Sequence, residues 1–145
     1  LNMPYVMRTD VISNPTDVYV NSCAAEAAAA GRKSSIIDAI GDDYSKISAR
    51  TAFTAMKEGD ALGAEIVDEY ISYLACGIVN ILNIFQPNVL SIGGGVCNEG
   101  DNLMKPLLEK VWGETYTREG TPRTEIKIAQ LGNDAGIIGA AVLGM

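Results

Sequence analysis

The sequence has no histidine among its 145 residues and only three cysteines, Cys23, Cys76 and Cys97. The cysteines are odd in number and form no C-x-x-C pair, which excludes a disulfide framework and the common zinc sites. We therefore expect free thiols in a reducing cytoplasm and no metal ligands. Without histidine, a general base would have to be a carboxylate or a lysine.

Basic residues are also few: 11 Lys and Arg stand against 18 Asp and Glu, for a net charge of −7. No basic run is present, so we expect no nucleic-acid partner, because affinity for a polyanion needs clustered basic side chains. The apolar stretch 70–85 is too short to span a membrane and includes Ser72, Asn80 and Asn83. The first residues lack the pattern of a signal peptide, so we expect a cytoplasmic protein without a membrane partner.

The composition is that of a soluble globular protein, with 48% apolar and 20% charged residues. The length fits one domain over residues 1–145. Leu1 stands where a complete chain would have Met, so we expect a fragment of a longer protein. Residues 1–33 have the weakest patterns: Val18–Val20 favours a short strand, and the alanine-rich stretch 22–30 favours a helix that ends at a glycine.

Residues 34–85 show the pattern of three successive helices. Apolar side chains recur at i, i+3, i+4 and i+7 along the third, which is the strongest periodicity in the chain and predicts one core-facing side. Pro87 ends this helix because proline cannot donate a hydrogen bond. Gly77, in its middle, costs about 1 kcal/mol relative to alanine, which indicates that a backbone or ligand passes close by. The predicted helices and caps are 35–40 after Ser34 or Ser35, 49–57 after Ser48, and 61–85 after Asp60.

Beyond Pro87 the pattern alternates between strands and helices. The β-branched run Val89–Ile92 predicts a buried strand, and residues 125–131 alternate polar and apolar side chains, as in a strand with one solvated face. A helix over 103–112 lies between them, and the small apolar residues of 135–143 predict a buried, closely packed final helix. Connections of this length are typical of parallel βα units. We predict an α/β fold, rich in helices, with a small parallel sheet.

Three glycines, Gly93, Gly94 and Gly95, follow the first predicted strand directly and precede Val96. They form neither the dinucleotide-binding fingerprint, whose third glycine is missing, nor a P-loop, because no Gly-Lys-Ser/Thr follows. One interpretation is a turn that needs positive φ; the other is a turn whose bare amides approach a phosphate or nucleotide. Ligands of open α/β sheets lie beyond the carboxyl ends of strands, where this turn is expected.

Other candidate residues have simpler interpretations. Cys97 lies near a helix start, where a thiolate is favoured, but no histidine can activate it and we interpret it as a packing residue. Asp134 or Asn133 is interpreted as a helix cap. A catalytic role of the Asp134 carboxylate is less favoured, because the sequence forces no second acid close to it. The remaining candidates are interpreted as solvated surface: Asp42, Asp43, Glu65, Asp68, Glu69, Tyr116, Arg118 and Arg123.

Several segments taken together give the chain a recognisable pattern: DEY at 68–70, LACGIVN at 74–80, IFQPNVLSIGGGV at 84–96 and LGNDAGIIGAA at 131–141. In this order and spacing they resemble the C-terminal end of the ROK family (repressor, open reading frame, kinase), and within it the bacterial glucokinases. The resemblance covers about residues 47–145.

The resemblance implies the two-lobed, actin-like and ribonuclease-H-like ATPase fold, with residues 34–145 as part of the C-terminal lobe. It also implies an intact protein that uses ATP with Mg²⁺ to phosphorylate a hexose hydroxyl by in-line transfer. The three glycines and Val96 match the adenosine-proximal loop of that fold, so their amides would line the nucleotide site. Gly77 falls on a helix that packs towards the cleft in such kinases.

The parts that the family uses for catalysis are not found in this sequence. The family's N-terminal lobe supplies a phosphate loop, the catalytic Asp and sugar contacts, and its Glu-x-x-Gly-His sugar motif and C-x-C-G-x-x-G-C zinc loop are missing here. We therefore expect no catalytic residue in this chain and no kinase activity from it alone. Two alternatives are a fragment of a sugar-responsive repressor of the same family and a non-catalytic module that forms a homo-oligomer.

Overall fold

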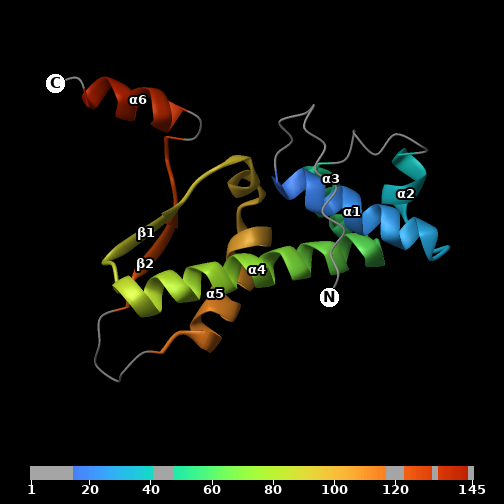
Figure 1. Ribbon diagram of the computed structural model, residues 1–145, viewed down its shortest axis with the longest axis horizontal. Helices are drawn as coiled ribbons and strands as arrows, with labels where there is room; N and C mark the ends of the chain where they lie inside the picture. Colours follow the sequence, from blue (N-terminus) through green and yellow to red (C-terminus); the bar gives the residue numbers. More distant parts are fainter. Residues whose placement is uncertain (1–14, 41–47, 117–122, 132–133, 144–145) are drawn as a thin grey trace. The chain divides into compact units, whose positions relative to one another are not determined.

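The computed structural model describes residues 15–40, 48–116, 123–131 and 134–143 (Figure 1). The chain divides into two compact units, 1–67 and 68–145. The division falls within the longest helix, α4 (Ala61–Phe85), and each unit has buried apolar residues of its own. Among the described residues, no helix is long and apolar enough to cross a membrane. The single domain expected over the whole chain stays a prediction.

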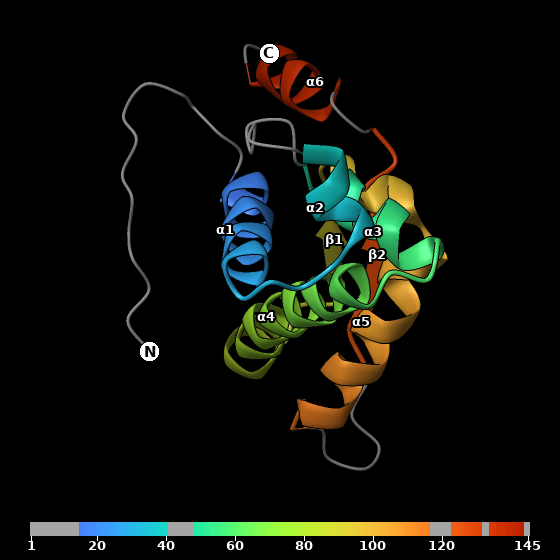
Figure 2. The ribbon, with the colours of Figure 1, turned by 90° about the vertical axis from the view of Figure 1, so that its right-hand side faces the viewer.

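The first unit contains three helices that contact one another, followed by the first turns of α4 (Figure 2). They are α1 (Pro15–Ala29), α2 (Ser35–Ile40) and α3 (Ala49–Lys57). Phe53 and Ile36 are the largest fully buried side chains of this unit. The other buried apolar residues are Val20, Ala24, Ala27, Ala52, Ala55, Leu62, Ile66 and Val67. The core of the first unit is therefore built mainly from alanine and aliphatic side chains.

The short strand expected at Val18–Val20 is wrong, because these residues belong to α1. Pro15 begins the helix, and proline suits a first helical position since its missing amide would have no partner there. Val20, Ala24 and Ala27 recur at i, i+4 and i+7 and are all buried. Packing of this face outweighs the strand preference of the β-branched residues.

The helix caps predicted from the sequence are confirmed. The hydroxyl of Ser34 accepts a hydrogen bond from Ile36 N at the start of α2 (3.1 Å), and Ser48 is the N-cap residue of α3. Asp60 Oδ1 accepts from the amide of Gly63 at the start of α4 (3.0 Å). The sequence did not show that Asp17 also reaches α3, where its Oδ1 accepts from Ala49 N (2.9 Å).

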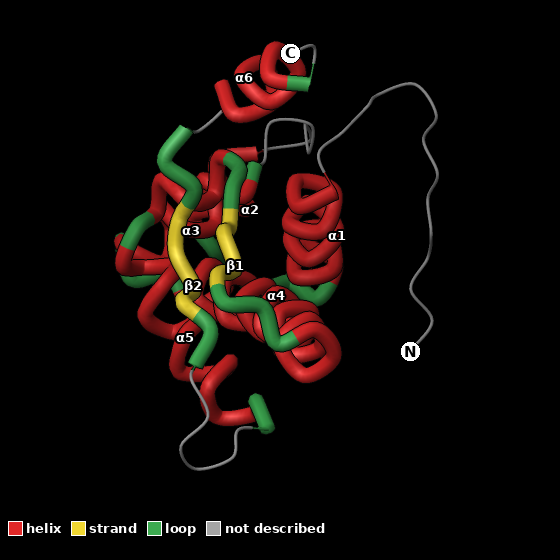
Figure 3. The backbone as a smooth tube through the Cα atoms, turned by 90° about the vertical axis from the view of Figure 1, so that its left-hand side faces the viewer, coloured by secondary structure: helices red, strands yellow, loops and turns green. Residues whose placement is uncertain are grey.

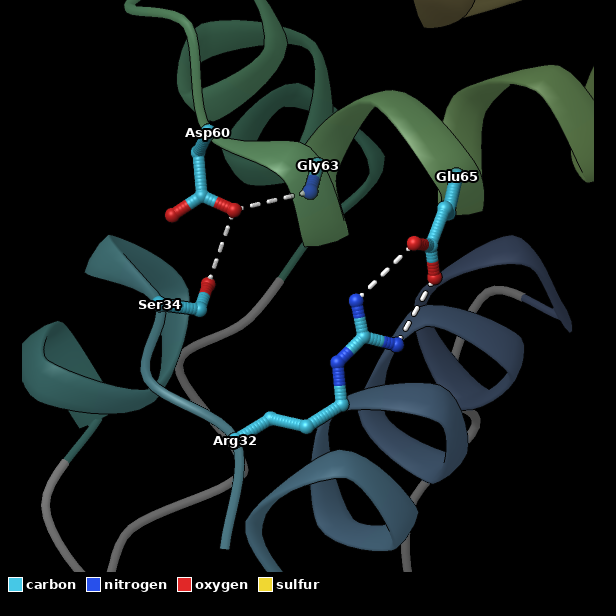
Figure 4. A network of polar contacts seen from close by, with 5 residues as sticks. All are labelled: Arg32, Ser34, Asp60, Gly63 and Glu65. Carbon is cyan, nitrogen blue, oxygen red and sulfur yellow. Dashed lines mark hydrogen bonds and ion pairs between the residues drawn. The ribbon is translucent and has the colours of Figure 1, made fainter. Parts of the chain in front are cut away.

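Asp60 does more than cap α4, because its carboxylate also holds the start of α2 (Figure 4). Oδ2 accepts from the amide and the hydroxyl of Ser35 at 2.6 and 2.9 Å, and Oδ1 accepts from the hydroxyl of Ser34 at 3.0 Å. Beside this network, Arg32 donates two hydrogen bonds to Glu65 at 2.7 and 2.9 Å. A single carboxylate thus joins the first residues of two helices.

We expect this network to make stability depend on acidity. Burial of the Asp60 carboxyl raises its pKa, but the hydrogen bonds from the amides of Gly63 and Ser35 and from two serine hydroxyls outweigh this, and the pKa falls from 3.8 to about 2. A carboxyl whose pKa is lower in the folded state stabilises the fold above its unfolded pKa. That contribution is lost as the pH falls from 3.8 through about 2.

The measurement is urea unfolding followed by circular dichroism at a series of acidic pH values, comparing the wild type with Asp60→Asn. The variant should have a smaller loss of stability in this pH range, because the amide cannot be protonated there. Asp38→Asn, an exposed position on α2, is the control and should keep the wild-type pH profile. A pH profile of Asp60→Asn that matches the wild type would contradict the assignment.

Gly63 and Gly77 have opposite surroundings on α4. A Cβ built on Gly63 would lie 2.7 Å from Met56 N and 2.8 Å from Ala55 Cβ, so the helix packs backbone to backbone against the end of α3 here. A Cβ on Gly77 would meet nothing within 4 Å among the described residues. The close approach predicted at Gly77 is therefore not found in the described part of the chain, and the tightly packed glycine is Gly63.

The second unit contains a two-stranded parallel sheet of β1 (Val89–Ile92) and β2 (Glu125–Ile128), which lie side by side in Figure 3. Val89 pairs with Glu125 and Ile92 with Ile128. The connection runs through a 3₁₀ helix, η2 (Gly95–Glu99), and α5 (Asp101–Glu114). In both strands exposed and half-buried positions alternate, which confirms the solvated face predicted for β2. The burial predicted for β1 is wrong, because none of its four residues is fully buried and Val89 is 46% exposed.

Polar contacts near both ends of the α4 segment in this unit join it to α5 and to the residues after it. Lys110 on α5 forms an ion pair with Asp68 (2.9 Å), and Tyr116 donates its amide hydrogen to Asn83 Oδ1 (3.0 Å). α4 ends at Phe85, before Pro87, as predicted. The buried apolar residues of the unit are Ile71, Ala75, Ile78, Val79, Leu82, Cys97, Leu103, Leu107 and Val111.

The final helix, α6 (Ala135–Val142), was expected to be buried, and this is wrong. The exposed fraction is 73% for Ile137, 43% for Ile138 and 61% for Val142. At the end of α4, Ile84 and Phe85 are also exposed. An apolar helix face is buried only where a second surface covers it, and the described residues do not supply that surface.

Candidate functional site: the glycine turn

The glycine turn, which we define as Gly93–Gly95, begins directly after β1. All three glycines are exposed and Val96 is half-buried. Gly94 has φ +104 and ψ 168, a backbone conformation that residues with a Cβ rarely adopt. The interpretation of the glycines as a turn with positive φ is therefore confirmed, at Gly94.

The space beside two of the three glycines holds no other described atom. A Cβ built on Gly94 or Gly95 would meet nothing within 4 Å, whereas on Gly93 it would lie 3.7 Å from Ala129 Cβ. Among the described residues, none accepts a hydrogen bond from the amide of Gly94 or Gly95. Backbone N–H groups without an acceptor are suited to an anionic ligand group.

The turn is fixed to the sheet at its first end. Ile92 O, at the end of β1, accepts a hydrogen bond from Ala129 N beyond β2 (2.8 Å) and another from Cys97 Sγ (3.5 Å). After the turn the chain passes through η2 to Gly100, whose φ of +55 directs it into α5. The parallel sheet and the start of α5 therefore set where the turn lies.

Cys97 is interpreted correctly as a packing residue. Its side chain is buried, with 8% of its surface exposed, and this burial raises the pKa of the thiol. A raised pKa keeps the sulfur protonated and weakly nucleophilic at neutral pH. Cys23 and Cys76 form no disulfide with another described residue.

The acidic candidates lie at the surface, as predicted, in the part of the chain that the structure describes. Glu65 pairs with Arg32 and Asp68 with Lys110, with 60% and 68% of the carboxylate side chains exposed. The described residues include no group of three or more His, Cys, Asp or Glu that could hold a metal ion. Asp42, Asp43 and Arg118 lie outside the described residues.

The remaining candidates are Arg123, Tyr116 and Asp134. Arg123 stacks its guanidinium over the ring of Trp112, 5.3 Å from the centroid, and Tyr116 is exposed. Asp134 donates its amide hydrogen to Leu131 O (3.0 Å), and the capping role of its side chain stays a prediction. The glycine turn is therefore the candidate site in the described part of the chain.

Comparison with known proteins shows which family and which solved structures this chain is similar to. A model of the ROK family matches residues 20–145, beginning earlier than the resemblance at 47–145. A glucokinase from Halalkalibacterium halodurans is 38% identical over 106 residues, which are 70% of this chain and 31% of that protein. The chain therefore spans about a third of the length of this relative.

Solved structures show the same fold. A putative sugar kinase from Cytophaga hutchinsonii superposes with a TM-score of 0.69 at 25% identity, and a ROK family glucokinase from Streptomyces griseus in complex with glucose and AMPPNP with 0.68 at 24%. Each superposition covers 88% of this chain and 40% of the other. The predicted α/β fold of the actin-like ATPases is thereby confirmed.

Proposed function

We propose that this chain, which belongs to the ROK family, supplies the nucleotide-side loop of an ATP-dependent sugar kinase. The observation that carries the proposal is the glycine turn: amides of Gly94 and Gly95 without acceptors among the described residues, at the carboxyl end of a parallel strand. Ligands of open α/β sheets bind at such ends. Support comes from the glucokinase relative and from the neighbour solved with AMPPNP.

The turn would act by binding and orienting the nucleotide. The amides of Gly94 and Gly95 donate hydrogen bonds without a side chain between them and the ligand, and the sheet prevents the turn from moving away. In-line transfer of the γ-phosphoryl group to a hexose hydroxyl depends on such positioning and on stabilisation of charge. The base and the sugar contacts would lie outside this chain, in keeping with the missing sugar motif.

Magnesium is a part of this chemistry that the described residues do not provide for. They contain no cluster of three or more possible ligands. Magnesium in phosphoryl-transfer sites is commonly bound by one or two carboxylates together with the phosphates of the substrate. We therefore derive no step through the ion from this chain.

The experiment that tests the proposal is calorimetric titration of the purified chain with ADP and Mg²⁺. We expect weak binding, with a dissociation constant of about 1 mM, or about −4 kcal/mol, because a single loop supplies only part of a nucleotide site. Adenosine without phosphates, titrated in parallel, reports how much the phosphates contribute. If no heat of binding is detected at ADP concentrations well above the expected dissociation constant, the assignment of the glycine turn to the nucleotide site is overturned.

The same chain, incubated with glucose, ATP and Mg²⁺, should form no glucose 6-phosphate. The reason is that the family's catalytic Asp and sugar motif cannot be placed in this sequence. A coupled assay for the product, with an intact glucokinase as positive control, checks the expectation. Detectable phosphorylation by the purified chain would show that the catalytic residues lie within it after all.

The two alternatives from the sequence stay open as predictions. The sequence has no cluster of basic residues, which would be expected of a part that binds DNA in a repressor. The exposed apolar side chains of α6 are suited to being covered by another protein surface. Either the remainder of a longer protein or a second copy of the chain would supply that surface. Neither alternative assigns a role to the open amides of the glycine turn.

A further inference from the structure

Cys97 makes hydrogen bonds at three points of the loop that runs from Ile92 through the glycine turn to Gly100. Its thiol donates to Ile92 O, just before the turn (3.5 Å). Its amide donates to Gly94 O within the turn (3.1 Å), and its carbonyl accepts from Gly100 N, where α5 begins (3.1 Å). One buried residue therefore contacts the start, the middle and the exit of this loop.

The thiol contact joins Cys97 to the last residue of β1, at the oxygen that also bonds to the segment after β2. Ile92 O is shared between Cys97 Sγ on one side and Ala129 N on the other, so the sulfur is held to the same atom that closes the sheet. Consecutive glycines have a large conformational freedom to lose on ordering. A restraint outside the glycines is therefore needed to keep their amides in one direction.

We propose that Cys97 is a positioning residue for the nucleotide: its buried side chain fixes the orientation of the Gly94 and Gly95 amides without touching the ligand. This inference rests on the proposed function of the turn. A cysteine side chain suits the role because it is small enough to be buried beneath the loop and still carries a weak donor. Serine keeps a donor of similar size at this place, and alanine removes it.

The test compares Cys97→Ala and Cys97→Ser with the wild type in titrations with ADP and Mg²⁺. Loss of one restraining hydrogen bond and its packing should weaken binding by Cys97→Ala about fivefold, whereas Cys97→Ser should stay within about twofold of the wild type. Cys76→Ala, which removes an exposed thiol on α4, is the matched control and should bind like the wild type. Circular dichroism establishes that each variant is folded at the temperature of the titration.

A second readout does not depend on binding. In ¹H–¹⁵N spectra, the amide resonances of Gly94 and Gly95 should move in Cys97→Ala and stay near their wild-type positions in Cys97→Ser and Cys76→Ala. If the wild type fails to bind ADP, the proposed function falls, and the spectra alone judge the role of Cys97. Unmoved glycine resonances in Cys97→Ala would overturn it, as would equal affinities of folded Cys97→Ala and the wild type.

A third readout uses the wild-type chain and so remains available if Cys97→Ala does not fold. Alkylation of each cysteine by iodoacetamide is followed by mass spectrometry with and without ADP and Mg²⁺. A ligand that orders the turn should slow the labelling of Cys97 about twofold or more, with no change at Cys76. Equal labelling of Cys97 with and without bound ADP would contradict the coupling between the thiol and the turn.

Discussion

Replacing Gly94 with valine is expected to abolish binding of ADP while the chain remains folded. The conformation of Gly94, φ 104 and ψ 168, costs a residue with a Cβ about 1–3 kcal/mol, less than the stability of an ordinary domain, about 5–15 kcal/mol. A Cβ at Gly94 would meet nothing within 4 Å, so the new side chain clashes with no described part of the chain. It would instead occupy the space through which a ligand reaches the open amides.

Gly100→Val is the matched control for this substitution. Gly100 also has a positive φ, +55, and a Cβ there would likewise meet nothing within 4 Å, but it lies at the exit of the loop. Titration calorimetry and thermal unfolding of both variants separate blocked access from backbone strain. Both should lose some stability, and only Gly94→Val should lose binding completely. Unchanged affinity in Gly94→Val would refute the role of the turn.

Replacing Gly63 with alanine is expected to destabilise the first unit, although the change adds only one methyl group. The added Cβ would lie 2.7 Å from Met56 N and 3.0 Å from the carbonyl carbon of Ala55, and backbone atoms cannot rotate away as a side chain can. Overpacking of this kind costs about 1–3 kcal/mol. Displacement of Gly63 would also lengthen its hydrogen bond to Asp60, which is 3.0 Å long. We expect a net loss of about 2 kcal/mol.

Gly77→Ala on the same helix is the control, because a Cβ there meets nothing within 4 Å. This variant should gain about 0.5–1 kcal/mol from the higher helix propensity of alanine. Urea unfolding followed at 222 nm measures both changes. The packing argument fails if Gly63→Ala is as stable as the wild type, and an equal loss in both variants would mean that the surroundings of the two glycines do not differ.

Much of the helical structure could be predicted because its causes are local. A capping side chain contacts amides two or three residues away, as Ser34 and Asp60 do, and Pro87 ends a helix through its own chemistry. The strand before the glycine turn was also predictable, since a β-branched run and a glycine break are both visible in the sequence. Local patterns thus predict where elements begin and end.

The errors have causes that lie far away in the sequence. The helix over Val18–Val20 depends on packing of a face that the sequence pattern did not reveal. The local sequence does not show whether another backbone packs closely against Gly63 or against Gly77. Only the position of α3 in the structure distinguishes the two glycines. The exposure of Ile137 on α6 depends on surfaces that the described residues do not contain.

The candidate site shows the same division. The three glycines and their place after a strand are visible in the sequence, but the conformation of Gly94 is not, nor is the contact of Cys97 with Ile92 O. The acceptor in that contact is shared with Ala129, which is far along the chain. The sequence therefore predicts where a ligand would bind and leaves open what holds the loop.

The pairing of β1 with β2 has a consequence for the order of folding. Val89 pairs with Glu125, so the sheet closes only when two residues 36 positions apart in the sequence (125 − 89) have come together. Closing a long loop delays contacts relative to those made within a helix. The turn at Gly93–Gly95 lies inside this segment, and Ile92 O gains its second donor only from Ala129. We therefore expect α4 and α5 to form early in folding, and the conformation of the glycine turn to be among the last features acquired.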